Sequence, residues 1–285
     1  MELIQEPLEL SALVSSWRGQ RQKIALVPTM GWFHAGHLAL MRQARQVADK
    51  VVVSLFVNPI QFGPSEDLAA YPRDLQRDMA LAAGVEVDLL YAPTATAMYP
   101  AGFQTSIRVA ELGRGLCGAS RPGHFDGVCT VVMKLFQQVQ PHLALFGEKD
   151  FQQLAVIKRM ARDLDLHIEI VAHPTVREAS GLAMSSRNSY LREDEQEQAL
   201  CLYRAILFAQ GRVRAALAPL SSAILCAEIL KNISQVPGCS VDYAEIVDAD
   251  TLERCETVNE NSRLIMAVTI NGRVRLIDNA RLFEV

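Results

Sequence analysis

Two histidines that could donate hydrogen bonds to phosphate groups lie in the segment of residues 28–37, where His34 and His37 flank Gly36. This segment directly follows an apolar run over residues 23–27, a pattern typical of a buried strand that passes into a helix. At such a crossing in an open α/β sheet, backbone N–H groups point outward and the helix dipole favours anions. The position and the residue types together predict a site for a nucleoside triphosphate.

The helix that must follow this turn is indicated by apolar residues at helical spacing, namely Leu38, Met41 and Ala44. Polar residues fill its other face. Gly36 has no Cβ atom, so the backbone at the start of this helix can lie close to a bulky ligand.

Apolar runs of strand length alternate with helical patterns from residue 23 to about residue 172. Strands that are apolar throughout are typical of parallel sheets buried on both faces. The alternation predicts an α/β fold built on a doubly wound parallel sheet. The predicted strands cover residues 23–27, 50–58, 87–92, 142–146 and 167–172, and the predicted helices cover residues 38–48, 72–83, 125–138 and 149–164.

The pattern changes beyond about residue 176, where helices are predicted over residues 193–210 and 220–232. Strand-like stretches follow over residues 241–247 and 264–277, and the second contains Asn271-Gly272, which is typical of a type I′ hairpin turn. This order predicts a smaller C-terminal α+β domain. We therefore divide the chain into a catalytic domain over residues 1–176 and a second domain over residues 177–285.

The composition of the 285 residues is that of a soluble globular protein, with 50% hydrophobic and 21% charged residues. A net charge of −4 leaves no basic excess to neutralise phosphates, which argues against a nucleic-acid partner. The six cysteines form no CxxC pair, which favours reduced thiols. Neither a signal peptide nor a long apolar span is visible, so we expect a cytoplasmic protein without a membrane segment.

The element His34-x-Gly36-His37 resembles the HxGH signature shared by nucleotidyltransferases and class I aminoacyl-tRNA synthetases. The preceding Pro-Thr-Met-Gly and several later segments, found in the same order, narrow the resemblance to the pantothenate synthetase family. Those segments are FVNPIQF at residues 56–62, RPGHFDGV at 121–128, GEKDFQQL at 147–154 and MSSRN at 184–188. The resemblance implies a Rossmann-like fold of the HxGH nucleotidyltransferase type.

The reaction that this resemblance implies is the ATP-dependent condensation of (R)-pantoate with β-alanine to give pantothenate. It would pass through a pantoyl adenylate and release AMP and pyrophosphate. ATP would be a substrate and would bring Mg²⁺ with it, because no dedicated protein cage for the ion can be read from the sequence. The resemblance also implies a homodimer. The adenylate is hydrolysable, so we expect the C-terminal domain to act as a lid that excludes water.

The catalytic residues implied by the resemblance are His37, His34 and Lys149, with His37 as the proton donor to the departing pyrophosphate. Carboxylate oxygens suit ribose hydroxyls, whereas hydroxyl and guanidinium groups suit phosphate oxygens. The implied ATP-binding residues are Met30, Gly31, His34, His37, Gly147, Glu148, Lys149, Asp150, Val176, Met184, Ser185, Ser186 and Arg187.

Gln61 and Gln153 match the family positions that bind pantoate, and Asn58 and Tyr71 are weaker candidates near the same pocket. Amide groups suit this substrate because each offers both a donor and an acceptor to its carboxylate and hydroxyls. Arg121 would suit either a substrate carboxylate or a phosphate, and the sequence does not decide between them.

Two other functions remain open on the sequence alone. A related nucleotidyltransferase would transfer a nucleotide to a phosphate acceptor, although the glutamines at positions 61 and 153 favour the ligase. A non-catalytic nucleotide-binding or metal-sensing module would use His34 and His37 as a metal pair. The remaining histidines show no grouping that would supply a third zinc ligand, and we predict no metal site.

Overall fold

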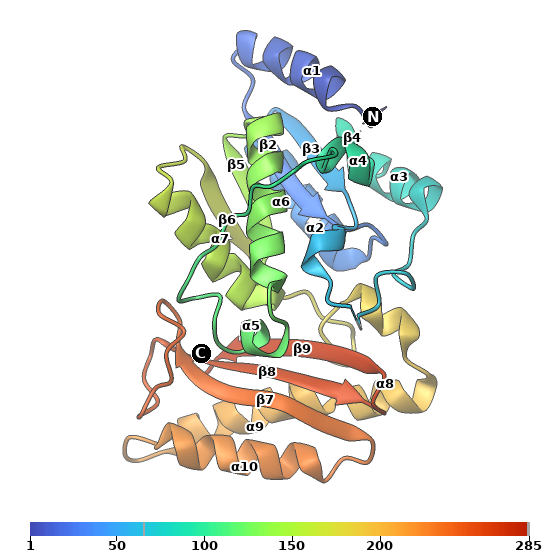
Figure 1. The fold of residues 1–285 in the computed structure, drawn as a ribbon. Helices are drawn as coiled ribbons and strands as arrows, with labels where there is room; N and C mark the ends of the chain where they lie inside the picture. The colour runs from blue at the N-terminus through green and yellow to red at the C-terminus, as the bar shows by residue number, and fades with distance from the viewer. Residues whose placement is uncertain (65, 284–285) are drawn as a thin grey trace. The chain divides into compact units, whose positions relative to one another are not determined.

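The structure is a computed structural model that describes residues 1–64 and 66–283 (Figure 1). The chain forms two compact units, which are described separately. Unit 1 contains Met1–Arg114, Arg121–Glu148 and Gln153–Pro174, and unit 2 contains Gly115–Ser120, Lys149–Gln152 and Thr175–Val285. The division of function between domains 1–176 and 177–285 stays a prediction.

Unit 1 is built on a parallel sheet of six strands in the order β1-β4-β3-β2-β5-β6, which confirms the predicted doubly wound α/β fold. The middle strands are apolar because helices cover both of their faces; Val51, Val52 and Val53, for example, have no exposed surface. The strands are β1 (Glu2–Ile4), β2 (Ile24–Thr29), β3 (Lys50–Leu55), β4 (Leu89–Tyr91), β5 (Leu143–Gly147) and β6 (Glu169–His173).

Strand β2 pairs with β3 on one side and with β5 on the other, although β5 comes much later in the chain. The strand order therefore reverses between β2 and β5. In open parallel sheets, ligands bind outside the carboxyl ends of the strands at such a switch point. The carboxyl end of β2 leads into the HxGH turn, and β5 ends at Gly147 and leads into Glu148.

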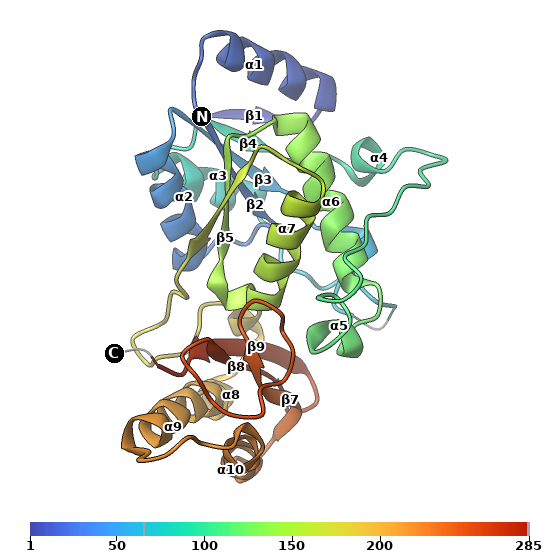
Figure 2. The same ribbon diagram turned by 90° about the vertical axis from the view of Figure 1, so that its left-hand side faces the viewer.

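Helices α2 and α3 cover one face of this sheet, and α6 and α7 cover the other (Figure 2). On the first face, Leu40, Met41 and Ala44 of α2 pack with strand residues in one hydrophobic cluster. The helical elements of this part of the chain are α1 (Pro7–Gly19), α2 (Ala35–Val47), η1 (Pro59–Gln61), α3 (Leu75–Ala83), α4 (Ala95–Met98), α6 (His124–Val139), η2 (Glu148–Asp150) and α7 (Phe151–Asp163).

Several element boundaries differ from those predicted from the sequence. The strand predicted to reach residue 58 ends at Leu55, and η1 begins with Pro59. The helix predicted from residue 72 begins at Leu75, because the side chain of Asp74 caps it by accepting the N–H of Arg77 at 3.0 Å. The first turn of the helix predicted over residues 149–164 is the separate 3₁₀ turn η2.

Unit 2 contains an antiparallel sheet of three strands in the order β7-β8-β9, as the predicted α+β domain requires. Asn271 and Gly272, between β8 and β9, have φ values of 49° and 64°, as a type I′ turn requires. The single helix predicted over residues 193–210 is two helices interrupted at Leu200. The elements are α5 (Cys117–Ser120), η3 (Ser186–Tyr190), α8 (Glu193–Ala199), α9 (Cys201–Ala215), α10 (Ser222–Ser234), β7 (Cys239–Asp248), β8 (Ser262–Ile270) and β9 (Val274–Arg281).

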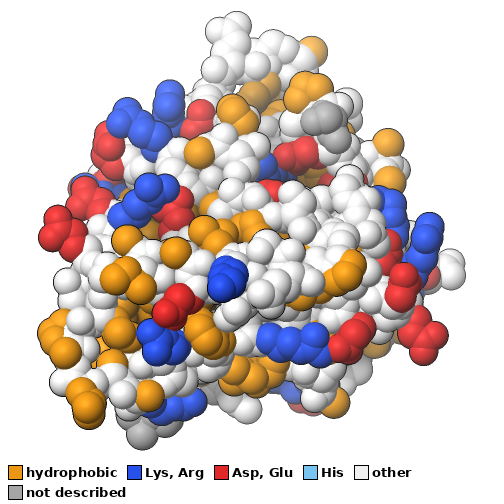
Figure 3. All heavy atoms as spheres, turned by 90° about the horizontal axis from the view of Figure 1, so that it is seen from below, with side chains coloured by type: hydrophobic (Ala, Val, Ile, Leu, Met, Phe, Trp, Pro, Cys, Tyr) orange, Lys and Arg blue, Asp and Glu red, His pale blue; other side chains and the backbone are white. Residues whose placement is uncertain are grey.

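One face of the β7-β8-β9 sheet packs against α9 and α10, with Leu264 and Met266 of β8 in the same cluster as Ile206 and Ile229. On the surface seen from below, Lys and Arg side chains are interspersed with Asp and Glu and with hydrophobic side chains (Figure 3). Within residues 1–64 and 66–283, no helix is both long and apolar enough to span a membrane.

Candidate active site

The HxGH turn after β2 has an unusual backbone that brings it against α3. Gly31 and Trp32 both have positive φ, at 87° and 52°. A Cβ atom at Gly31 would lie 3.1 Å from Oδ2 of Asp78, so a glycine allows both the left-handed conformation and the close approach. The sequence predicted the turn but did not identify Asp78.

The side chain of Asp78 holds this turn by accepting hydrogen bonds from the backbone of the turn. Its carboxylate is fully buried and accepts the N–H of Trp32 at 2.7 Å and the N–H of Phe33 at 2.8 Å. Burial raises the pKa of Asp78, and the two backbone N–H groups and the charge of Arg77 offset only part of that effect. Arg77 also donates to the carbonyl of Phe33 at 2.8 Å and lies over the Trp32 ring.

The hydrogen bonds of the turn determine which nitrogen of each histidine carries its proton. The N–H of Gly36 points to Nδ1 of His34 at 3.1 Å, and the N–H of His34 points to Nδ1 of His37 at 3.3 Å. Both Nδ1 atoms therefore accept, so in the neutral rings the proton lies on Nε2. The two rings are close and tilted by 33° to one another, with centroids 4.0 Å apart. The arrangement provides a pair of Nε2–H donors.

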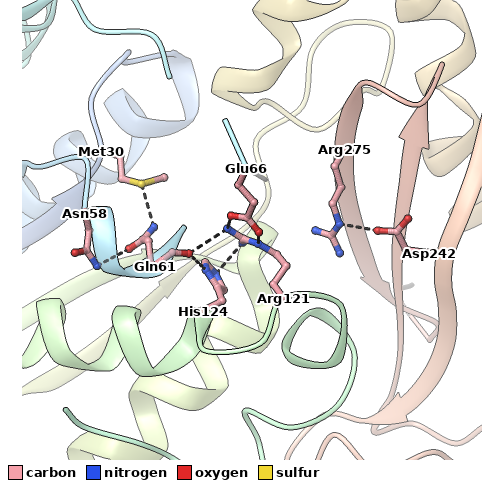
Figure 4. A network of polar contacts seen from close by, with 8 residues as sticks. All are labelled: Met30, Asn58, Gln61, Glu66, Arg121, His124, Asp242 and Arg275. Atoms are coloured by element: carbon pink, nitrogen blue, oxygen red, sulfur yellow. Dashed lines mark hydrogen bonds and ion pairs between the residues drawn. The ribbon is translucent and has the colours of Figure 1, made fainter. Parts of the chain in front are cut away.

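Gln61 in η1 is held from several directions in unit 1 (Figure 4). Its side-chain oxygen accepts Nδ2 of Asn58 at 3.0 Å, and its Nε2 contacts Sδ of Met30 at 3.0 Å. Helix α6 approaches η1 so closely that a Cβ at Gly127 would lie 2.5 Å from the carbonyl oxygen of Ile60. The structure thus brings together Asn58, Gln61 and Met30, which the sequence assigned to substrate and nucleotide binding.

Arg121 forms a two-point ion pair with Glu66, in which Nε and Nη2 donate to the carboxylate at 2.7 and 2.6 Å. Burial acts to raise the pKa of Glu66. The hydrogen bond and charge of Arg121, together with the N–H of Gly63, outweigh it and hold the pKa below its usual value. Arg121 and Gln61 are therefore parts of one polar network (Figure 4).

The other two predicted pantoate ligands also lie in unit 1. Tyr71 is buried, with its ring edge-on to Phe62 at 6.0 Å between centroids, and its carbonyl accepts Nη1 of Arg73. Gln153 is half-buried in α7. Their proposed contacts with substrate stay predictions.

Lys149 and Asp150 belong to unit 2, where Nζ of Lys149 lies 3.6 Å from the Asp150 carboxylate. The carbonyl of Lys149 accepts Nδ2 of Asn279 at 2.8 Å, and Oδ1 of Asn279 accepts Nε of Arg263 at 2.7 Å. Arg263 is buried and lies over the Phe151 ring at 3.9 Å. Strands β8 and β9 thereby fix the backbone that carries Lys149. The sequence did not indicate this support.

The loop that carries Val176, Met184, Ser185, Ser186 and Arg187 is also part of unit 2. The N–H of Met184 donates to the carbonyl of Val176 at 3.0 Å, so two residues expected at the adenosine lie side by side. Oγ of Ser185 accepts the N–H of Arg187 at 3.2 Å and caps η3.

An ion pair that the sequence did not indicate supports this loop. Both terminal nitrogens of Arg177 donate to the buried carboxylate of Asp278, at 2.6 and 3.0 Å. Arg177 also donates to the carbonyl of Gly181 at 3.1 Å. Such supporting residues carry no motif of their own, because they act on backbone groups far away in sequence.

A doubly wound sheet with a histidine-bearing turn at its switch point defines the class, an α/β protein of the nucleotide-binding type. A family model described as pantoate-beta-alanine ligase matches residues 2–281. The pantothenate synthetase of Geobacter sulfurreducens is 51% identical and covers 100% of this chain and 99% of its own. That of Trichlorobacter lovleyi is 52% identical and covers 99% of each. The chain belongs to the pantoate–β-alanine ligase family and is an enzyme.

Solved structures agree with this assignment. The crystal structure of pantothenate synthetase from Thermus thermophilus matches with a TM-score of 0.94 and 44% identity, and covers 100% of both chains. The pantoate–β-alanine ligase from Francisella tularensis, crystallised with β-γ ATP and β-alanine, matches with a TM-score of 0.81 and 34% identity. It covers 100% of this chain and 99% of that one.

Proposed function

We propose that the chain catalyses the ATP-dependent ligation of pantoate to β-alanine. In the first half-reaction a pantoate carboxylate oxygen attacks the α-phosphorus of ATP, and the bond to the departing pyrophosphate breaks. In the second, the amine of β-alanine attacks the acyl carbon of pantoyl adenylate, AMP leaves and the nitrogen loses a proton. The fixed pair of Nε2–H donors in the HxGH turn is the observation that carries this proposal.

His34 and His37 are proposed to stabilise charge on the phosphates as pyrophosphate departs. Catalysis of such a transfer is mostly positioning and electrostatic stabilisation, and donors that are already oriented cost no reorganisation. The backbone of the turn orients both rings before ATP arrives. His37 is the proposed proton donor to pyrophosphate.

Residues of the later segments are proposed to contact the remainder of ATP. Lys149 would supply a point charge to phosphate oxygens, and Asp150 would accept the ribose hydroxyls. Ser185, Ser186 and Arg187 are proposed phosphate ligands. The proposed adenosine and backbone contacts are Met30, Gly31, Gly147, Glu148, Val176 and Met184.

Pantoate is proposed to bind the amides of Gln61 and Gln153, with Asn58 and Tyr71 beside them. The support for Gln61 is its fixed side chain, which Asn58 orients. We further propose that Mg²⁺ enters with the triphosphate, that the enzyme is a cytoplasmic homodimer, and that residues 177–285 act as a lid during adenylate formation.

The test is pantoate-dependent exchange of labelled pyrophosphate into ATP without β-alanine. We expect exchange with the wild-type protein and a loss of about 100-fold or more in His37→Ala, since one oriented donor in a transition state contributes on that order. Binding of pantoate should change little, because this interaction grows in the transition state.

His167→Ala is the matched control, because His167 is an exposed histidine outside the turn, and it should retain full exchange. A folded protein that binds ATP but shows no exchange would contradict carboxylate adenylation and favour nucleotide transfer to another acceptor. Unchanged exchange in His37→Ala would remove His37 from the catalytic residues.

A further inference from the structure

The residues at the start of α6 belong to a hydrogen-bonded network of polar groups that the proposed function does not use. Glu66 pairs with Arg121, Arg121 contacts His124, and both Arg121 and His124 reach the carbonyl oxygen of Gln61 (Figure 4). His124 is buried, with 8% of its surface exposed. This network therefore reaches the backbone carbonyl of Gln61, a residue proposed to bind pantoate.

The contacts of His124 fix its tautomer from both sides. Nη1 of Arg121 lies 3.0 Å from Nε2 of His124, and a guanidinium can only donate, so Nε2 accepts. Nδ1 lies 2.8 Å from the carbonyl oxygen of Gln61, which can only accept, so Nδ1 carries the proton. The neutral ring thus transmits the position of Arg121 to the Gln61 backbone.

The same network occupies all three guanidinium nitrogens of Arg121. Nε and Nη2 donate to Glu66, Nη1 donates to His124, and Nη2 also lies 3.4 Å from the Gln61 carbonyl. A guanidinium engaged in this way orients its neighbours, and binding a substrate anion would require it to give up its two-point bond to Glu66.

Gln61 is in turn constrained on its other sides. Asn58 Nδ2 donates both to the side-chain oxygen of Gln61 and to the carbonyl of Gly127, at 3.0 and 3.1 Å. With its carbonyl held by His124 and its amide held by Asn58, a shift of the backbone at this residue would move the amide out of place. Small displacements of a positioned group cost a large part of its effect.

We propose that Arg121 and His124 are positioning residues for pantoate recognition and act through Gln61. This inference rests on the proposed function, in which the Gln61 amide binds pantoate. In it, the charge of Arg121 serves Glu66 and the Gln61 loop and does not bind a substrate carboxylate or a phosphate.

Two substitutions of His124 separate its two nitrogens. Asn places an N–H donor where Nδ1 stands, whereas Gln places its amide at the distance of Nε2. His124→Asn should therefore retain the bond to the Gln61 carbonyl and keep a KM for pantoate within about twofold of wild type. His124→Gln should lose that bond and raise the KM for pantoate about tenfold, with the KM for ATP unchanged. His167→Gln is the control on an exposed histidine.

A double-mutant cycle shows whether His124 acts through Gln61. Gln61→Ala removes the amide to be positioned, so adding His124→Gln to it should raise the KM for pantoate no further. Equal effects of His124→Gln in the presence and absence of the amide would overturn the proposal. So would equal effects of Asn and Gln at position 124, or a rise in the KM for ATP or β-alanine in Arg121→Lys.

Thermal unfolding of each variant in the absence of ligands keeps the result interpretable. A His124→Gln protein that is less thermostable and weaker for both pantoate and ATP would reveal a general structural role and overturn the proposal. If Gln61→Ala alone leaves the KM for pantoate unchanged, the proposed role of Gln61 fails instead. The two failures are therefore distinguishable.

Discussion

Two buried carboxylates, Asp78 in unit 1 and Glu195 in unit 2, both support turns, but their pKa values are shifted in opposite directions. Each is almost inaccessible to solvent, and Asp78 accepts two backbone N–H groups of its unit whereas Glu195 accepts one. Yet the pKa of Asp78 is raised, whereas that of Glu195 is lowered to about 2. Burial alone therefore does not decide the ionisation of a structural carboxylate in this protein.

The difference lies in the donors that surround each group. Glu195 accepts the N–H of Arg192 at 2.8 Å, Nη2 of Arg273 at 2.5 Å and Nδ2 of Asn271 at 3.1 Å. These bonds stabilise the charged form and outweigh desolvation. Asp78 has its two backbone donors and a longer contact of 3.3 Å to Arg77, with desolvation as the largest effect. Ionising Asp78 in the folded protein therefore costs folding stability.

The HxGH turn therefore depends on a carboxylate whose charged form is disfavoured by burial. The β8–β9 turn depends on a carboxylate whose charge is stabilised by the donors around it. Backbone N–H groups at Trp32 and Phe33 need an acceptor, and Asp78 supplies it. The fold thus accepts a less favourable carboxylate environment in order to hold the turn that carries His34 and His37.

The largest effect is expected for Asp78→Ala, because it leaves two backbone N–H groups without their acceptor. We expect a loss of about 3 kcal/mol in the free energy of unfolding, measured by urea titration. Pyrophosphate exchange should fall at least about tenfold, since the turn that carries His34 and His37 loses its support. Asp163→Ala, at an exposed ion pair of α7, is the control and should change either quantity little. Full exchange in Asp78→Ala would break the link between this carboxylate and the turn.

A smaller effect is expected for Glu195→Gln, which keeps the shape of the side chain but removes its charge. The bond from Arg273 weakens, so the melting temperature should fall, but by less than in Asp78→Ala. The kcat should stay within about twofold of wild type, because Glu195 supports the hairpin turn at Asn271, which carries none of the proposed catalytic residues. A loss of exchange as large as that of Asp78→Ala would remove the distinction between the two carboxylates.

The smallest effect is a difference in pH dependence. The lowered pKa of Glu195 means that its stabilisation is present above its ordinary pKa of 4.5 and is lost as pH falls towards about 2. The stability advantage of wild type over Glu195→Gln should therefore widen as pH rises through this range. Asp78 has a raised pKa, so ionising it costs stability as pH rises above 3.8. The advantage of wild type over Asp78→Asn should narrow there, and parallel curves for the two variants would contradict the comparison.

Much of the sheet and the position of the two histidines in the turn could be predicted because their signals are local. An apolar run before Pro28 and helical spacing after Gly36 place the turn between β2 and α2, as observed. Alternating apolar runs also indicate the parallel sheet. Helix α1 was missed, although Leu10, Val14 and Trp17 lie buried on one face and Pro7 begins it.

The supporting residues could not be predicted because their partners are distant in the chain. Asp78 serves N–H groups more than forty residues away, and His124 serves a carbonyl 63 residues away. Backbone groups carry no residue-specific signal, so the sequence gives no reason to pair these positions. The motif at residues 121–128 was visible, but its role as support for Gln61 required the structure.

Strand β1 has a consequence for how the protein must be handled. Its residues Glu2 to Ile4 form the strand that pairs with the outer edge of β4, where Leu89, Leu90 and Tyr91 are buried. An uncovered edge of such apolar composition is a template for intermolecular pairing. Shortening the chain past Ile4 is therefore expected to promote aggregation, and fusion partners are better attached through a spacer that leaves this strand free to pair.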